Sequence, residues 1–202
     1  VRLQHLNGRI KPFLLRRTKE QVATELPPKT EIIHWVELNE AQRDVYEAMR
    51  LAMDRKVRDE VTRKGVARSQ IIILEALLKL RQVCCDPRLL KSVSAQKVKE
   101  RAKLDLLMDM LPELLDEGRK VLLFSQFTSM LAPIELELAA RKIEYVILTG
   151  DTQDRETVIR NFQEGKVPVF LISLKAGGVG LNLTAADTII HYDPWWNPAV
   201  EN

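Results

Sequence analysis

The second half of the 202-residue chain alternates between short apolar runs and longer stretches with helical periodicity. Four apolar runs predict buried strands, at residues 120–124, 144–148, 167–173 and 188–193. Between them the pattern predicts helices at residues 128–142 and 154–165 and a short helix at 181–186. Continuous apolar strands separated by helices predict an α/β fold, in which a parallel sheet is covered by helices on both faces.

Right-handed connections between parallel strands place the loops that follow the strands along one edge of the sheet, where ligands bind in such folds. Here those loops are SQFT (residues 125–128), TGDT (149–152) and the glycine loop KAGGVGLNLTAAD (175–187). The three glycines of the last loop indicate that the backbone closely approaches another group. We expect this edge to be the functional face.

The first half of the chain has a different pattern. Paired prolines, Pro27 and Pro28, predict an extended linker, and residues 31–38 have the pattern of an amphipathic strand. Asn39 and Gln42 fit a capping box at the start of a long helix that ends at Gly65.

Two more helices are expected in this half, at residues 70–84 and 98–117. The first has Ile73, Leu77 and Leu80 on its apolar stripe. Pro112 should kink the second helix or start a new one. We therefore divide the chain into a linker (1–30), a strand with a helical insertion docked on the lobe (31–118) and an α/β lobe (119–202).

Composition narrows the class of protein. Hydrophobic residues make up 46% of the chain and charged residues 29%, which is typical of a soluble globular protein. No apolar run approaches the ~20 residues of a membrane span, so we expect no membrane partner. The adjacent Cys84 and Cys85 are poorly placed for a disulfide, and the scattered histidines lack the spacing of a zinc site. A net charge of +3 does not by itself indicate nucleic acid, although two local clusters are basic, Lys11/Arg16/Arg17/Lys19 and Lys97/Lys99/Arg101/Lys103.

The motifs of self-sufficient enzymes are missing. The glycine loop lacks the lysine and hydroxyl that end a phosphate-binding G-x-x-x-x-G-K-[ST] loop. The dinucleotide fingerprint G-x-G-x-x-G fails at Leu183. No G-x-S-x-G elbow supplies a serine nucleophile, and LLDE at residues 114–117 is better explained as a helix terminus than as a metal site. We assign no catalytic or metal-binding residue to this chain.

A series of longer motifs carries a family resemblance. Their order is KPFLLRRTKEQV, ELPPKTE, KLRQVCCDPRLL, KVLLFSQFTSML, LTGDT and LISLKAGGVGLNLTAADTIIHYDPWWNPAVEN. This order closely resembles the C-terminal RecA-like lobe of Swi/Snf-type DNA-dependent ATPases, the chromatin-remodelling and helicase-like motors of helicase superfamily two. The resemblance runs from about residue 11 to residue 202, and the helical insertion matches the one that these proteins carry in their second lobe.

The resemblance implies an ATP site between two lobes, with ATP and Mg²⁺ bound mainly by a first lobe that this chain lacks. Three residues are expected to face the nucleotide: Gly178, Gly180 and Asn182. Others are expected to contact double-stranded DNA, mainly at its phosphates: Gln126, Ser173, Lys175, Gly177, Trp196 and Asn197. Structural alternatives remain for several of these residues. Trp196 would cap the sheet edge, Lys175 would be a solvated loop cation, and Gln126 would satisfy a turn.

Two departures from the family pattern affect the expected activity. Leu174 stands where many relatives have threonine, which removes one phosphate contact. The chain also stops at Asn202, before the arginine-bearing motif Q-x-x-D-R-x-x-R-x-G-Q. Because an arginine finger contributes about 10³–10⁵ in rate, we expect the chain alone to show no ATPase activity.

The sequence thus predicts the second motor lobe of an ATP-dependent double-stranded DNA translocase. The expected partners are duplex DNA, the missing first lobe and a protein target on DNA. The location would be the cytoplasm (nucleoid) in a bacterium or the nucleus in a eukaryote. The alternative is a non-catalytic module that retains the RecA-like fold and docks DNA or protein. A metabolic nucleotide-binding domain is disfavoured by the failed dinucleotide fingerprint.

Overall fold

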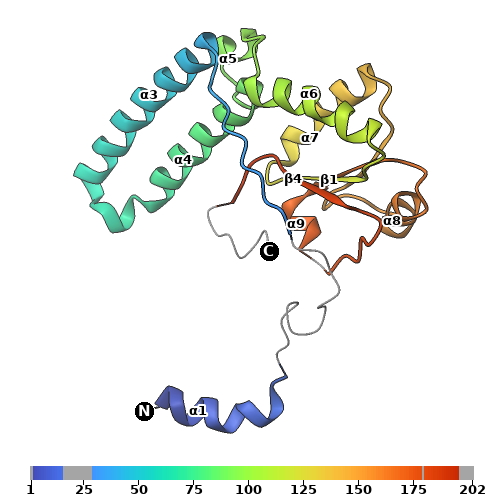
Figure 1. Ribbon diagram of the computed structural model, residues 1–202. Helices are drawn as coiled ribbons and strands as arrows, with labels where there is room; N and C mark the ends of the chain where they lie inside the picture. The colour runs from blue at the N-terminus through green and yellow to red at the C-terminus, as the bar shows by residue number, and fades with distance from the viewer. Residues whose placement is uncertain (1, 16–28, 179, 196–202) are drawn as a thin grey trace. The chain divides into compact units, whose positions relative to one another are not determined.

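The computed structural model describes residues 2–15, 29–178 and 180–195 (Figure 1). Contacts divide the chain into two compact units, residues 1–35 and 36–202. The first unit contains helix α1 (Arg2–Ile10) and the short 3₁₀ helix η1 (Lys11–Phe13). In the part of the chain that is described, no helix is long and apolar enough to cross a membrane.

The strand expected at residues 31–38 is not formed, so that prediction was wrong. Residues 29–39 belong to neither a helix nor a strand, and the side chains of Ile32, Ile33 and Trp35 are largely exposed. A strand needs a neighbour to accept and donate its backbone hydrogen bonds. None of the described strands pairs with this segment. Its alternating pattern therefore does not produce a strand.

The helical insertion begins with a hairpin of two long helices, α3 (Glu40–Lys64) and α4 (Gln70–Cys85), which lie side by side in Figure 1. Gly65, at φ 76°, ends α3, and the 3₁₀ helix η2 (Val66–Arg68) leads into α4. The 3₁₀ helix η3 (Pro87–Leu89) and helix α5 (Val93–Lys97) follow. The interior of the helical insertion is a small cluster of apolar side chains around Val83, Leu90 and Ala95.

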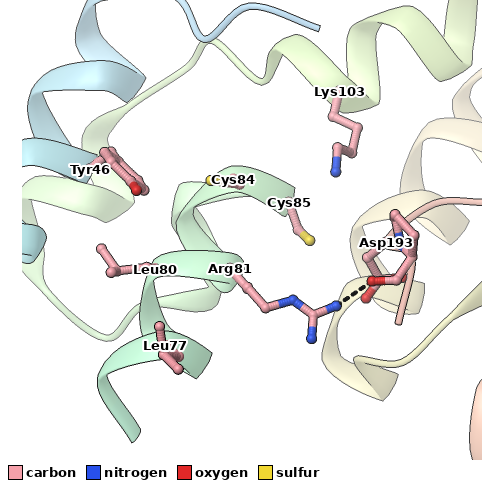
Figure 2. Close-up of a pocket in the computed structure, with 9 residues that line it drawn as sticks. Tyr46, Leu77, Leu80, Arg81, Cys84, Cys85, Lys103 and Asp193 are labelled. Atoms are coloured by element: carbon pink, nitrogen blue, oxygen red, sulfur yellow. Dashed lines mark hydrogen bonds between the residues drawn. The ribbon is translucent and has the colours of Figure 1, made fainter. Parts of the chain in front are cut away.

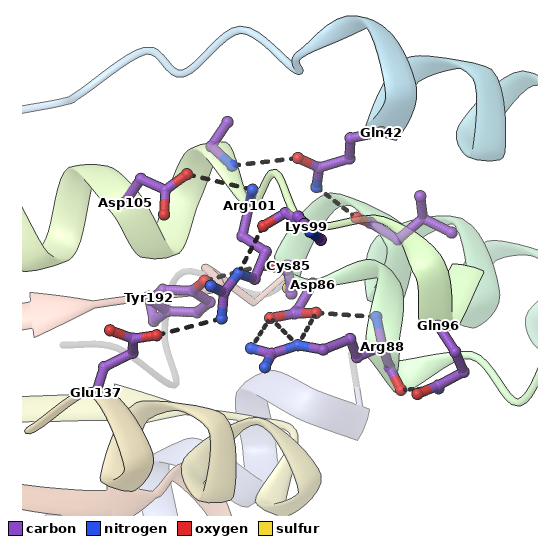
Figure 3. Close-up of polar contacts among 12 residues, drawn as sticks. Gln42, Cys85, Asp86, Arg88, Gln96, Lys99, Arg101, Asp105, Glu137 and Tyr192 are labelled. Carbon is purple, nitrogen blue, oxygen red and sulfur yellow. Dashed lines mark hydrogen bonds and ion pairs between the residues drawn. The ribbon is translucent and has the colours of Figure 1, made fainter. Parts of the chain in front are cut away.

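The capping box expected at Asn39 and Gln42 is absent, although α3 begins where it was predicted. Asn39 occupies the cap position without a side-chain hydrogen bond. The Gln42 side chain is fully buried instead. Its Nε2 donates to the Val83 carbonyl at 2.8 Å, and its Oε1 accepts from the Ala102 amide at 3.2 Å (Figure 3). Gln42 therefore joins three helices of the insertion and lobe rather than capping its own.

The lobe is an α/β sandwich, as predicted. Its elements in order are α6 (Ala102–Asp116), β1 (Val121–Ser125), α7 (Thr128–Ala140), β2 (Tyr145–Leu148), α8 (Arg155–Gln163), β3 (Val169–Ser173), α9 (Leu174–Gly177) and β4 (Thr188–His191). The strands form a four-stranded sheet in the order β2-β3-β1-β4, and all pairs are parallel.

Each face of the sheet has its own hydrophobic core. Leu123 of β1 packs with residues of α6 and α7, such as Leu107 and Met130. Its neighbour Leu122 packs in the other cluster, with Phe162 of α8 and Phe170 of β3. Because successive strand residues point to opposite faces, a sheet covered on both sides requires the continuous apolar runs seen in the sequence.

Two of the predicted helix details were also wrong. Helix α6 starts at Ala102 rather than at residue 98, and Pro112 does not start a new helix, because burial of Leu104, Leu107 and Leu111 on one face outweighs the loss of one backbone hydrogen bond. Residues 181–186 form a loop with a turn. The short helix lies earlier, at α9, where the Ser173 hydroxyl accepts a hydrogen bond from the Ala176 amide at 3.4 Å.

Candidate functional site

The loops predicted to form the functional face do lie at one edge of the sheet. Ser125 at the end of β1 is in register with Ser173 at the end of β3. Phe124 is in register with His191 at the end of β4, and the two rings stack with centroids 5.5 Å apart. The parallel register therefore brings the β1–α7 loop, the glycine loop and the segment after β4 together.

Two of the three glycines of the glycine loop are required by the structure, for different reasons, and the third is not. A Cβ atom on Gly177 would lie 2.7 Å from Cε1 of Phe124 and 3.4 Å from Cγ2 of Ile172, so this glycine permits close packing on the sheet. Gly180 has a φ of +63°, which side chains rarely tolerate. A Cβ on Gly178 would meet nothing closer than the Lys175 carbonyl oxygen at 3.8 Å. Neither packing nor backbone conformation requires glycine at Gly178, which is exposed.

The residues expected to contact DNA, other than Gly177, differ in where the structure places them. Lys175 is exposed on α9, beside the glycines. Ser173 is buried, and its hydroxyl caps α9. Gln126 is half-buried, and its Nε2 has no hydrogen-bond partner in the described part of the chain. Trp196 and Asn197 lie outside the described residues. The structure thus brings Lys175, Ser173 and Gln126 to one edge, with the Ser173 hydroxyl turned to the protein.

Two side chains of α8 that the sequence analysis did not single out hold the glycine loop. The Nε2 of Gln163 donates to the Asn182 carbonyl at 3.0 Å and to the Thr184 hydroxyl at 3.3 Å. The Oε1 of Gln163 accepts from the Ala185 amide at 2.8 Å. At the other end of the loop, Nη2 of Arg155 donates to the Ala176 carbonyl at 3.1 Å. These partners lie about twenty residues away along the chain, so no local pattern revealed them.

Asp193, directly after β4, is a buried carboxylate at the same edge. Its two oxygens accept from the backbone amide of Gln126 at 3.1 and 3.2 Å, which ties the β1–α7 loop to the end of β4. Burial raises the pKa of Asp193 to about 6, against the lowering effect of hydrogen bonds from Ser125 and Gln126 and of the cations Lys103 and Arg81. This aspartate therefore titrates near neutral pH.

A cavity of about 340 Å³ separates part of the helical insertion from this edge (Figure 2). It is lined by Tyr46, Leu77, Leu80, Arg81, Cys84, Cys85, Lys103, Asp193 and Pro194. Burial raises the pKa of Cys85 to about 12, so its thiol is a packing group rather than a nucleophile. Beside the cavity, the buried Tyr192 hydroxyl donates to the Cys85 carbonyl at 2.9 Å and fixes the insertion to the sheet.

The two adjacent glycines predict different responses to the same substitution. Gly177→Ala is expected to lower the free energy of unfolding by about 1–3 kcal/mol, because the new methyl group would overlap the Phe124 ring. Gly178→Ala is the matched control, with an expected change within about 0.5 kcal/mol, because its Cβ would make only ordinary van der Waals contacts. Urea denaturation of both variants measures the difference, and equal losses would show that Gly177 is not required for packing.

Comparison with known families decides the identity. A model of the helicase conserved C-terminal domain matches residues 102–202, and a model of the SNF2-related domain matches residues 2–89. The chain belongs to the SNF2-type helicase family. The SNF2-type lobe has the parallel sheet and flanking helices that the sequence predicted.

Relatives of this SNF2-type chain are much longer than it is. It is 37% identical over 202 residues to an uncharacterized ATP-dependent helicase of Mycoplasma genitalium. This match covers 98% of the chain and 19% of that protein. It is 36% identical over 208 residues to a putative ATP-dependent helicase/translocase of Bacillus subtilis, covering 100% of the chain and 22% of that protein. The chain thus spans about a fifth of these curated relatives.

A solved structure of a SWI2/SNF2 ATPase is also similar to this chain. The SWI2/SNF2 ATPase core of Sulfolobus solfataricus in complex with dsDNA is 34% identical, with a TM-score of 0.72. The match covers 96% of this chain and 42% of that one. The family resemblance inferred from the sequence motifs is confirmed.

Proposed function

We propose that this SNF2-type domain is the second motor lobe of an ATP-dependent translocase of double-stranded DNA. The proposal is supported by the relative from Bacillus subtilis, named as a helicase/translocase, and by the structural neighbour from Sulfolobus solfataricus, solved with dsDNA. The observation that carries it is the glycine loop, which presents an exposed cation and open backbone at the edge of the sheet.

The residues of the glycine loop fit one side of a phosphate site. The open surface at Gly178 leaves room for a bulky anion, and the positive φ of Gly180 turns the chain toward Asn182. Gln163 holds the carbonyl of Asn182 in place. We propose that Gly178, Gly180 and Asn182 face ATP, whose hydrolysis supplies the free energy for movement, and that Mg²⁺ is held mainly by the first lobe.

The DNA grip is proposed to act on the phosphate backbone. Lys175 would supply the cation, Gly177 main-chain contacts, and Gln126 its side-chain amide nitrogen, which is buried and unpaired in the described part of the chain. The buried Ser173 hydroxyl would act by capping α9, which orients the loop. Trp196 and Asn197 complete the proposed contact by their position in the D-P-W-W-N-P motif. Such contacts do not read base sequence. Because they neutralise phosphates and release counterions, binding should weaken steeply with salt.

Lys175→Ala is expected to lower affinity for duplex DNA uniformly across sequences and to reduce the slope of log K against log salt by about one. The control is Lys166→Ala, since Lys166 is exposed at the opposite edge of the sheet, before β3, and pairs with Glu164 at 2.8 Å. The measurement is fluorescence anisotropy of labelled DNA over a range of salt concentrations, with the chain extended by its own flanking sequence. An unchanged salt slope would remove Lys175 from the grip.

The function itself is tested by ATP hydrolysis with and without duplex DNA. The protein is the chain extended by its own flanking sequence to the length of its relatives, and the 202-residue chain is assayed in parallel. We expect strong stimulation by DNA in the extended protein and no turnover in the chain alone, because the chain supplies only one side of the nucleotide site. Turnover by the chain alone would contradict the division of labour between lobes.

Absence of turnover in a folded extended protein would favour the alternative, a non-catalytic docking module. The observation that favours this alternative is an apolar surface on the helical insertion. Ile71, Leu74 and Leu78 recur at helical spacing on α4, and all three are exposed.

A further inference from the structure

Arg81 of α4 makes two contacts with the segment that follows β4. Its Nη2 donates to the Pro194 carbonyl at 2.5 Å, across 113 residues of sequence. Its guanidinium carbon lies 5.3 Å from the centroid of the Trp195 ring, within the range of a cation–π interaction. In Figure 2 the side chain extends from α4 along the cavity toward Asp193.

The same segment is held at each successive residue. The Tyr192 hydroxyl bonds to the Cys85 carbonyl, and Lys103 of α6 lies over the Tyr192 ring at 5.6 Å. Asp193 accepts from the Gln126 amide. Arg81 then contacts Pro194 and Trp195. All of these contacts except the one with Gln126 come from the helical insertion and α6, so the insertion determines the path of the chain after β4.

That path leads directly to Trp196, the next residue in the sequence and a proposed DNA contact. Because Arg81 bonds to the residue two positions before Trp196 and stacks on the residue one position before it, a change in Arg81 alters where the chain enters that contact. A planar guanidinium can donate to a carbonyl and stack on an indole at once, which the point charge of a lysine does less well.

We propose that Arg81 is a positioning residue, through which the helical insertion sets the geometry of the segment that carries the DNA-contacting tryptophan. The positioning itself depends only on the contacts described above, whereas its consequence for DNA rests on the proposed translocase function. The insertion would then be part of the DNA grip, although it supplies no phosphate contact through Arg81.

The first experiment measures positioning in the 202-residue chain. A Trp35→Phe background removes the signal of the tryptophan at residue 35, which is 90% exposed, and leaves Trp195 and Trp196 as reporters. Arg81→Met is expected to raise the acrylamide quenching constant at least twofold, because the indole loses its stacked cation, and Arg81→Lys should give an intermediate value. The control is Lys79→Met on the same helix, where Lys79 pairs with Glu75 instead.

The second experiment measures the DNA concentration that gives half-maximal stimulation of ATP hydrolysis in the extended protein. Arg81→Met should raise this concentration about fivefold, which corresponds to the loss of one hydrogen bond and one cation–π contact. Arg81→Lys should recover part of the loss, and Lys79→Met should have no effect. Thermal melting of each variant, followed by circular dichroism, separates this effect from a general loss of stability.

Each outcome decides the proposal. Unchanged quenching in Arg81→Met would overturn it, and so would changed quenching with an unchanged DNA requirement in an enzyme that DNA stimulates. If DNA stimulates no turnover in the wild-type extended protein, the proposed translocase function fails, and with it the role of Arg81 in DNA binding. The quenching measurement would then still decide whether Arg81 positions the segment.

Discussion

Asp86→Ala is expected to lower the free energy of unfolding of this chain by about 3 kcal/mol, because it removes one partner of a buried ion pair. Asp86 is fully buried and accepts three kinds of hydrogen bond from Arg88. These come from the backbone amide at 2.8 Å, from Nε at 3.0 Å and from Nη2 at 2.7 Å (Figure 3). The pair closes the turn between α4 and α5, within the helical insertion.

The expected loss lies at the lower end of the range for such pairs. The Arg88 side chain is 28% exposed, so after the substitution its charge can still reach water. The Asp86 hydrogen bond raises the pKa of Arg88 from its usual 12.5. Without Asp86 the guanidinium still stays charged at neutral pH, and it loses this partner. Asp86→Asn should lose less than Asp86→Ala, because an amide oxygen can still accept from the Arg88 backbone.

The matched control is Glu47→Ala. Glu47 pairs with Arg50 at 2.8 Å, nearly the distance of the Asp86–Arg88 pair, but both side chains are 48% exposed. An exposed pair contributes about 0–1 kcal/mol, so the control should be nearly neutral. Urea denaturation at neutral pH measures all three variants. A loss in Asp86→Ala no larger than in Glu47→Ala would show that burial adds nothing to the Asp86–Arg88 pair.

The Asp193→Asn variant is expected to become more stable toward unfolding, relative to wild type, as pH rises. Burial raises the pKa of Asp193 to about 6 from the usual 3.8. Between these two values the folded chain binds a proton that the unfolded chain has lost. The contribution of Asp193 to stability is therefore fully present below about pH 4 and is lost as pH rises through about 6.

The size of this effect follows from the shift in pKa. A shift of about 2 units corresponds to roughly 3 kcal/mol between the two protonation states. Asparagine removes the buried charge and keeps an acceptor for the Gln126 amide. The difference in unfolding free energy between Asp193→Asn and wild type should thus change by about 2–3 kcal/mol in favour of the variant from pH 4 to pH 8.

Urea denaturation of both proteins at several pH values measures that difference, in which the titration of all other groups largely cancels. The exposed Asp151 offers a control variant, Asp151→Asn, which is measured at the same pH values. If the Asp193→Asn difference is constant from pH 4 to pH 8, the cations Arg81 and Lys103 fully compensate the burial of the carboxylate.

Burial of Asp193 has a consequence for the proposed function. The carboxylate joins the Gln126 loop to the segment that leads to Trp196, so it links two of the proposed DNA contacts. Its neighbours in this position come from different elements, namely β1, α4 and α6. The surroundings of Asp193 are therefore assembled by the tertiary structure, although Asp193 itself belongs to a motif that can be read from the sequence.

The α/β lobe, the helical insertion and the family can all be inferred from the amino-acid sequence. Apolar runs and helical stripes depend on which face of each element is buried, and this leaves a periodic signal in the local sequence. The edge that carries the loops followed from the handedness of parallel connections. The long motifs identified the SNF2-type lobe, and the family models confirmed it. The assignments of individual ATP and DNA contacts remain predictions.

Which polar side chains hold the site together is seen only in the folded chain. Gln42 bonds to Val83 instead of capping its helix, Gln163 holds Asn182, and Arg81 bonds to Pro194. The predicted strand at residues 31–38 failed for the same reason that these contacts could not be foreseen. A hydrogen bond depends on a partner that folding brings close from a distant part of the chain, and such a partner leaves no periodic pattern in the sequence around either residue.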